Sequence, residues 1–362
     1  MFNIRKQLAK LYTSSVIGNL SLSGAWVAIL ASRGYSLTEI GIAETVFHIT
    51  SLIFELPSGA MADVFGRKKM LMVSCIMAMI GNAVMFFSDN LFMVCLSIAF
   101  QALCYNFSSG SGDALAYDSL KSVEMERDFE RYESNQLVIY RLCGGLSTLC
   151  AGFALVIGHR LAYGIDIIIE LIQLAVLGTL TEFYGESPES AKTASQKLIS
   201  CFKESIAFLK REKRAVKLMF CNSFVGAADI LLLFFLQAKL PEKGIPNWAL
   251  GPALLIMELG GIIGSKLILK LKGLEYKRVF AIAALLVLTG LAAEHSPLYL
   301  IMILGGFISA AGDDALQVRT NAVLQDMFPS EQRAALTSAE SFTFSVIMIF
   351  LSPLAGWFFT IW

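Results

Sequence analysis

The stretch Gly59-Ala-Met-Ala-Asp63-Val-Phe-Gly66-Arg67-Lys68-Lys69 decides the fold class of this chain. A long apolar run leads into it and another leaves it, so the sequence predicts a tight turn between two helices. A soluble protein does not need such a basic turn, whereas Lys and Arg hold the loops of membrane proteins on the cytoplasmic side. The stretch therefore predicts a cytoplasmic hairpin that joins two membrane-spanning helices.

The composition extends this prediction to all 362 residues. Hydrophobic residues make up 56% and charged residues 16% of the chain, against about 45–50% and about 25% in soluble domains. The formal net charge is zero, which argues against a nucleic-acid partner. The seven cysteines form no Cys-x-x-Cys pair, so we expect neither a disulfide framework nor a metal site. The sequence predicts an all-α polytopic membrane protein whose first span is not cleaved.

Apolar stretches of roughly 20 residues are long enough to cross the hydrocarbon core of a bilayer as helices. The sequence contains about eleven of them. We expect spans near residues 9–32, 37–61, 69–88, 91–120, 132–157, 160–183, 215–239, 247–271, 278–294, 296–325 and 335–360. Lysine and arginine are concentrated in every second connection, including the N-terminus, which predicts a cytoplasmic N-terminus in the inner membrane of a cell.

One long polar connection, 185–214, divides the chain. Apolar residues recur in it at helical spacing, so we expect an amphipathic helix at the cytoplasmic surface. It would separate an N-terminal bundle of spans one to six, 1–184, from a C-terminal bundle of spans seven to eleven, 215–362. The motif Gly112-Asp113-Ala-Leu115 recurs as Gly312-Asp313-Asp314-Ala-Leu316. The halves are therefore expected to be repeats, and a twelfth span is missing by comparison.

The hairpin stretch resembles the loop between the second and third spans of major facilitator superfamily transporters, which reads Gly-x-x-x-Asp-x-x-Gly-Arg-Lys. The matching residues are Gly59, Asp63, Gly66, Arg67 and Lys68. The resemblance implies a bundle of two six-helix repeats that works by alternating access. It also implies a gate, in which Asp63 caps the eleventh span and Arg67 pairs with Asp118. The alternative is a topology anchor without a gating role, and Lys68 is interpreted as a surface base that faces lipid head groups.

Ionisable residues inside the spans form a second set of candidates, because such residues usually face a cavity or a partner. Glu44 and His48 share one helical face and either exchange protons or only hydrogen-bond. Asp113 and Arg141 are expected to pair, as a fixed strut or as a switch. The resemblance adds polar residues on the spans that line the path in this family. The complete predicted pathway is Asn19, Glu44, His48, Asp113, Arg141, Asp229, Asp313 and Asp314.

Motifs typical of enzymes are absent from the sequence: it contains no Gly-x-Ser-x-Gly, no phosphate-binding glycine loop and no His-Glu-x-x-His. We therefore expect no enzyme activity and no cofactor. The resemblance implies a monomeric secondary transporter in the bilayer, an antiporter for efflux of a small organic compound or drug against protons. The chain departs from the family's antiporters at Asn106, where they carry arginine. Uptake of a nutrient or metabolite, and a non-transporting receptor or remnant, remain alternatives.

Overall fold

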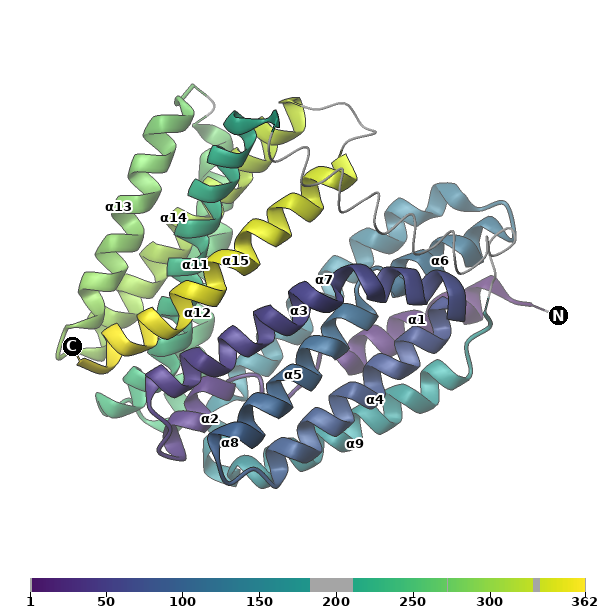
Figure 1. Ribbon diagram of the computed structural model, residues 1–362, viewed down its shortest axis with the longest axis horizontal. Helices are drawn as coiled ribbons and strands as arrows, with labels where there is room; N and C mark the ends of the chain where they lie inside the picture. Colours follow the sequence, from purple (N-terminus) through teal and green to yellow (C-terminus); the bar gives the residue numbers. More distant parts are fainter. Residues whose placement is uncertain (1, 183–210, 272, 328–332, 362) are drawn as a thin grey trace. The chain divides into compact units, whose positions relative to one another are not determined.

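The computed structural model describes residues 2–182, 211–271, 273–327 and 333–361. In these residues all regular secondary structure is helical (Figure 1). Within these described ranges, nine helices are long and apolar enough to cross a membrane, or ten if one bent pair is counted as a span. The protein is therefore a multi-pass membrane protein, as its composition predicts. Most of the expected linker 185–214, and the turn before the last span, lie outside the described residues.

The helices follow the expected spans closely. In the first part of the chain they are α1 (Ile4–Gly18), α2 (Trp26–Ser32), α3 (Leu37–Phe65), α4 (Arg67–Phe86), α5 (Leu91–Ser108), α6 (Ser111–Lys121), the 3₁₀ turn η1 (Glu126–Asp128), α7 (Phe129–Leu149), α8 (Ala151–Ile157) and α9 (His159–Gly178). In the second part they are α11 (Lys213–Glu242), α12 (Asn247–Lys270), α13 (Tyr276–Glu294), α14 (Tyr299–Met327) and α15 (Arg333–Ile361).

The first expected span differs from the prediction. Instead of one helix over 9–32, α1 ends at Gly18 and the short α2 begins at Trp26. The residues between them include Asn19, Ser21 and Ser23, whose side chains compete with helical backbone hydrogen bonds. A mean hydropathy does not reveal this break, because leucines that alternate with the serines keep the average apolar. The fifth expected span is also bent, by 45° between α7 and α8.

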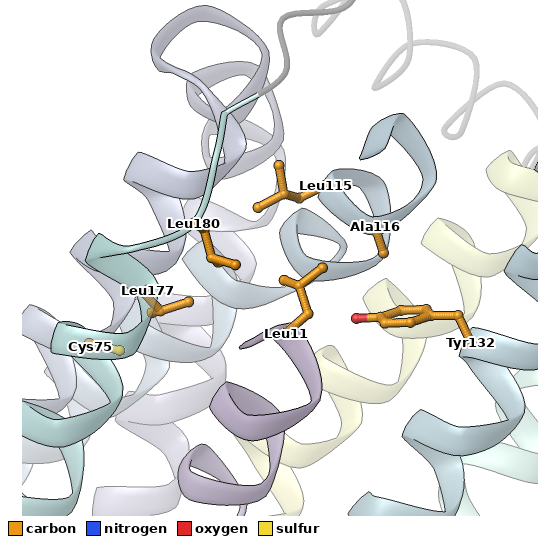
Figure 2. Packing of buried hydrophobic residues seen from close by; sticks show 7 residues of the cluster. All are labelled: Leu11, Cys75, Leu115, Ala116, Tyr132, Leu177 and Leu180. Carbon is orange, nitrogen blue, oxygen red and sulfur yellow. The ribbon is translucent and has the colours of Figure 1, made fainter. Parts of the chain in front are cut away.

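The described contacts divide the chain into two compact units. The first comprises residues 1–24, 46–150 and 157–200, and the second comprises residues 25–45, 151–156 and 201–362. In the first unit, α1, α4, α6, α7 and α9 bury a shared apolar core (Figure 2). Its labelled members are Leu11, Cys75, Leu115, Ala116, Tyr132, Leu177 and Leu180. The Tyr132 ring stacks on Tyr12 with centroids 5.2 Å apart.

In the second unit, α12 packs on α14 by close backbone contact. A Cβ at Gly260 would overlap the carbonyl oxygen of Phe307, and one at Gly264 would overlap that of Ala311. Small residues four apart let membrane helices approach in this way. These two glycines of the eighth expected span, 247–271, therefore let α12 approach α14 closely.

Candidate functional site

The hairpin stretch forms the junction between α3 and α4 in the first unit. Gly66 separates the two helices with φ of +97°, a backbone conformation that favours glycine. Gly59 and Asp63 lie within α3, in its last two turns. The helix α4 then begins at Arg67, so its first backbone N–H groups need partners outside the helix.

A carboxylate that is distant in the sequence supplies these partners. Glu182 lies just after α9, and its Oε1 accepts the backbone N–H of Arg67 at 3.1 Å. Its Oε2 accepts the N–H of Lys68 at 2.9 Å. A Cβ on Gly66 would lie 2.8 Å from Oε2. Gly66 is therefore needed for the turn and for the approach of the carboxylate, which also sits favourably at the positive end of α4.

The side chain of Lys68 makes a second connection, from α4 back to α9. Its Nζ donates to the carbonyl oxygens of Gly178 at 2.8 Å and Leu180 at 2.7 Å, at the C-terminal end of α9. Cations stabilise the negative end of a helix. The interpretation of Lys68 as a base that faces lipid head groups is therefore wrong, because its ammonium group binds protein carbonyls instead.

The predicted contact of Arg67 is present. Its Nε lies 3.4 Å from Oδ2 of Asp118, near the end of α6. The hairpin is thus tied to α6 by an ion pair and to α9 by reciprocal caps. These contacts hold the start of α4 in one conformation.

Three acids of the predicted pathway gather in the second unit. Asp229 on α11 is 4% exposed, and its Oδ1 has no hydrogen-bond partner among the described residues. It lies near Ser309 and Asp314 of α14, and Asp313 lies near both other acids. Within the described residues, no lysine or arginine pairs with Asp229 or Asp313. Burying a carboxylate such as that of Asp229 without a cation is costly, so Asp229 and the neighbouring Asp313 are suited to a group that brings positive charge.

Glycines make room for two of these carboxylates. A Cβ at Gly226 of α11 would lie 3.2 Å from Oδ1 of Asp313. A Cβ at Gly261 of α12 would overlap the Oδ2 of Asp314. The two neighbouring acids of α14 therefore face different helices. In the parts of the chain that the structure describes, no group of three or more His, Cys, Asp or Glu side chains is arranged to hold a metal ion.

The predicted pathway residues of the first bundle are not gathered in this way. Glu44 and His48 are buried one turn apart on α3, at 9% and 7% exposure. Asn19 caps the end of α1, and its Nδ2 donates to the carbonyl oxygen of Ser15 at 2.8 Å. The side chain of Asn19 is therefore engaged by its own helix.

The expected pair of Asp113 and Arg141 is not formed. Asp113, in the first turn of α6, interacts with Glu133 and Tyr132. Arg141 lies over the ring of Tyr140, with 5.9 Å from its Cζ to the ring centroid. Both Asp113 and Arg141 are exposed, so neither needs the other to offset burial of its charge.

Comparison with known proteins agrees with the hairpin and the helical bundle. Residues 11–293 match the family model described as Major Facilitator Superfamily. The chain belongs to the major facilitator superfamily. It is 25% identical over 254 residues to the uncharacterized MFS-type transporter YxaM of Bacillus subtilis, covering 69% of this chain and 62% of that protein. It is 22% identical to the inner membrane transport protein YajR of Escherichia coli, covering 65% and 50%.

Solved structures of other superfamily members share the fold. The nucleoside transporter NupG aligns with a TM-score of 0.73 at 15% identity, covering 98% of this chain and 90% of that chain. A D-xylose-proton symporter aligns with a TM-score of 0.66 at 14% identity, covering 96% and 89%. The chain spans less than two thirds of the length of the two sequence relatives named above.

Three acids that make specific contacts in this chain were not among the residues predicted from the sequence. Asp166 of α9 is 4% exposed and binds the break between α1 and α2. Glu294, at the end of α13, is 3% exposed and lies 2.7 Å from Nδ1 of His295 and 3.7 Å from Nζ of Lys239. Both acids lie at or within apolar runs, and this position in the sequence could have identified them as candidates. Glu182 carries no such signal, because it stands at the last turn of the sixth expected span, 160–183, where charged residues are ordinary.

We expect the Glu182→Gln variant to lower the stability of the purified protein by about 1–3 kcal/mol, because the first N–H groups of α4 lose a charged acceptor. The measurement is thermal unfolding in detergent. Glu130→Gln, at an exposed position on α7, is the matched control and should leave the unfolding temperature unchanged. Equal stability of both variants would show that Glu182 does not hold the hairpin.

Proposed function

We propose that this chain is a secondary active transporter that exports a small, partly apolar organic compound in exchange for protons, by alternating access. The observation that carries the proposal is the packing inside the second unit. There, residues 25–45 and 151–156, which come from the N-terminal half of the chain, cluster with residues of the C-terminal half. With the N-terminus in the cytoplasm, as the distribution of bases predicts, these are outer helix ends.

Glycines form the closest of these contacts. A Cβ at Gly152 would overlap the carbonyl oxygen of Asn247, and one at Gly41 would overlap that of Ser352. A Cβ at Gly356 would overlap the carbonyl oxygen of Leu37. Contacts between a glycine and a backbone carbonyl can separate without breaking an ion pair. This packing supports an outer closure that opens and closes during transport.

The acids of the second unit support proton coupling. Asp229 and Asp313 are close together without a base among the described residues, so bound protons or a cationic cargo would offset their repulsion. In the first unit, Asn106 instead forms an uncharged pair: its Nδ2 donates to the carbonyl oxygen of Ser51 at 2.7 Å, and its Oδ1 accepts from the hydroxyl group at 2.9 Å. We therefore assign the coupling of transport to protons to Asp229, Asp313 and Asp314.

The hairpin is proposed as the inner gate, with Asp63 capping the eleventh span. We expect the Asp63→Asn variant to reduce transport severely and leave expression largely intact, because it removes a charge at the gate and no apolar packing. The measurement is the rate of transport per molecule in membranes. Asp89→Asn, in an exposed loop, is the matched control and should transport normally. Normal cycling of the Asp63→Asn variant would remove the gating role.

Uptake is the second candidate direction, because the structural neighbours include a nucleoside transporter and a D-xylose-proton symporter. A ligand screen by thermal shift, run on purified protein at two pH values, tests for cargo binding. We expect some compounds to stabilise the protein, with a dependence on pH that is lost in the Asp229→Asn variant. A folded protein that no compound stabilises at either pH would favour a non-transporting receptor or remnant.

A further inference from the structure

A buried carboxylate makes most of the hydrogen bonds that hold the break between α1 and α2. Oδ1 of Asp166, on α9, accepts the backbone N–H of Leu22 at 2.8 Å. Its Oδ2 accepts the N–H of Ser23 at 3.0 Å, the hydroxyl of Ser23 at 2.6 Å and the hydroxyl of Ser21 at 2.8 Å. Non-helical backbone within a membrane span needs such partners, because lipid supplies none. Asp166 therefore satisfies two of the N–H groups that the break leaves unpaired, and the hydroxyl of Ser147 on α7 accepts a third, that of Ser21, at 3.0 Å.

On the N-terminal side of the break, α1 is fixed to α9. Gln7 donates to the carbonyl oxygen of Thr181 at 2.9 Å and accepts the N–H of Thr181 at 3.1 Å. Nε2 of Gln173 donates to the carbonyl oxygen of Ser14 at 3.2 Å and would overlap a Cβ at Gly18. These polar contacts run along α1 as far as its end, so α1 and α9 are expected to move together.

On the other side, α2 packs within the second unit when the outer helix ends are closed. Val27 and Leu30 are each 0% exposed, and the ring of Trp26 meets Phe234 of α11 edge-on with centroids 5.8 Å apart. The chain passes from the first unit to the second between Gly24 and Ala25, directly after the residues that Asp166 binds. Any change of angle between α1 and α2 must therefore be taken up in the short segment 19–25.

We propose that residues 19–25 are a hinge in the first span and that Asp166 is the positioning residue that keeps this hinge unwound. The role of the hinge in transport rests on the proposed function, whereas its existence does not. Hinges in proteins are short segments that absorb backbone rotation between rigid parts, and interrupted helices are common in transporters. Asp166 holds the N–H groups of Leu22 and Ser23 while the angle changes, so no buried donor is left without a partner.

The hydrogen bonds also distinguish the role of Asp166 from the role proposed for the coupling acids of the second unit. All four groups that its carboxylate contacts are hydrogen-bond donors, two backbone N–H groups and two hydroxyls. The nearest other acid of α9 is Glu170, one turn further on. Asp166 therefore acts by holding the backbone of the break.

Hydrogen exchange tests the hinge without any cargo. In the Asp166→Asn variant we expect exchange of the N–H groups in segment 19–25 to rise by about ten-fold or more, since a charged acceptor is lost. Exchange in α1 and α9 should stay as in the unchanged protein. The Ser21→Ala/Ser23→Ala double variant keeps both backbone contacts and should show a smaller rise, and it serves if Asp166→Asn does not fold. Glu170→Gln, on the same helix, is the matched control and should show no local rise.

Spin-label distances provide the second readout, in protein whose native cysteines are replaced. Labels at the exposed positions Val16 of α1 and Ser32 of α2 should give a broader distance distribution in Asp166→Asn. Labels at Val16 and Ile172, on α1 and α9, should give the same distribution in both proteins. Unchanged exchange and distances would overturn the proposal, as would a rise in exchange throughout α1 and α9. A protein that transports nothing, yet shows the local changes, would contradict only the proposed function.

Discussion

The Gly152→Leu variant is expected to lose transport by roughly ten-fold or more, because its outer ends no longer close. A Cβ at this position would overlap the carbonyl oxygen of Asn247, and the carbonyl carbon would lie 2.6 Å away. A helix backbone does not yield as a flexible side chain does. Overpacking costs about 1–3 kcal/mol, and about 1.4 kcal/mol already changes a population ten-fold.

Labelling with a membrane-impermeant maleimide measures this closure. Ser352, which contacts Gly41, is 0% exposed, so a Ser352→Cys change in a cysteine-free background should be labelled slowly. Adding Gly152→Leu should speed the labelling. Gly144→Leu is the control, because a Cβ at that position on α7 meets nothing within 4 Å. Full transport together with unchanged labelling in Gly152→Leu would contradict the outer closure.

The Asp229→Asn variant is expected to abolish proton-driven transport while leaving the protein as stable as before or more stable. Asp229 and Asp313 lie close together, and no lysine or arginine pairs with either among the described residues, so removing one carboxylate relieves their repulsion. Transport loses the group that changes charge during the cycle. A loss of function with a gain of stability is typical of a residue kept for its activity.

Two measurements on one preparation separate these effects: the unfolding temperature, and the transport rate with and without a pH gradient. Asp128→Asn, at an exposed site before α7, is the matched control and should behave like the unchanged protein. If the Asp229→Asn variant kept its response to the pH gradient, Asp229 would not be a coupling residue. A large fall in stability would assign it a structural role instead.

The hairpin was predictable because its signal is local. The order of Gly66, Arg67 and Lys68 after an apolar run defines a turn at a membrane surface, and the predicted contact of Arg67 with Asp118 is confirmed. The bundle fold was predictable for a related reason: each span carries its own hydropathy signal.

The contacts that hold the break and the hairpin were not predictable, because their partners lie far apart in the sequence. Asp166 binds Ser21 across 145 positions, and Glu182 binds Arg67 across 115. Hydropathy averaged over a span also hides a break of a few residues. The expected pair of Asp113 and Arg141 was wrong because sequence spacing does not show that both side chains are exposed.

Flux in proteoliposomes directly tests whether this chain moves a compound in exchange for protons. Protein is reconstituted with a pH-sensitive dye inside, and a compound that stabilises it in the thermal-shift screen is added with and without an imposed pH gradient. We predict movement of the compound that follows the gradient, is coupled to proton movement, stops with a protonophore and is absent in the Asp229→Asn variant. Folded, ligand-binding protein that moves neither the compound nor protons would contradict the account.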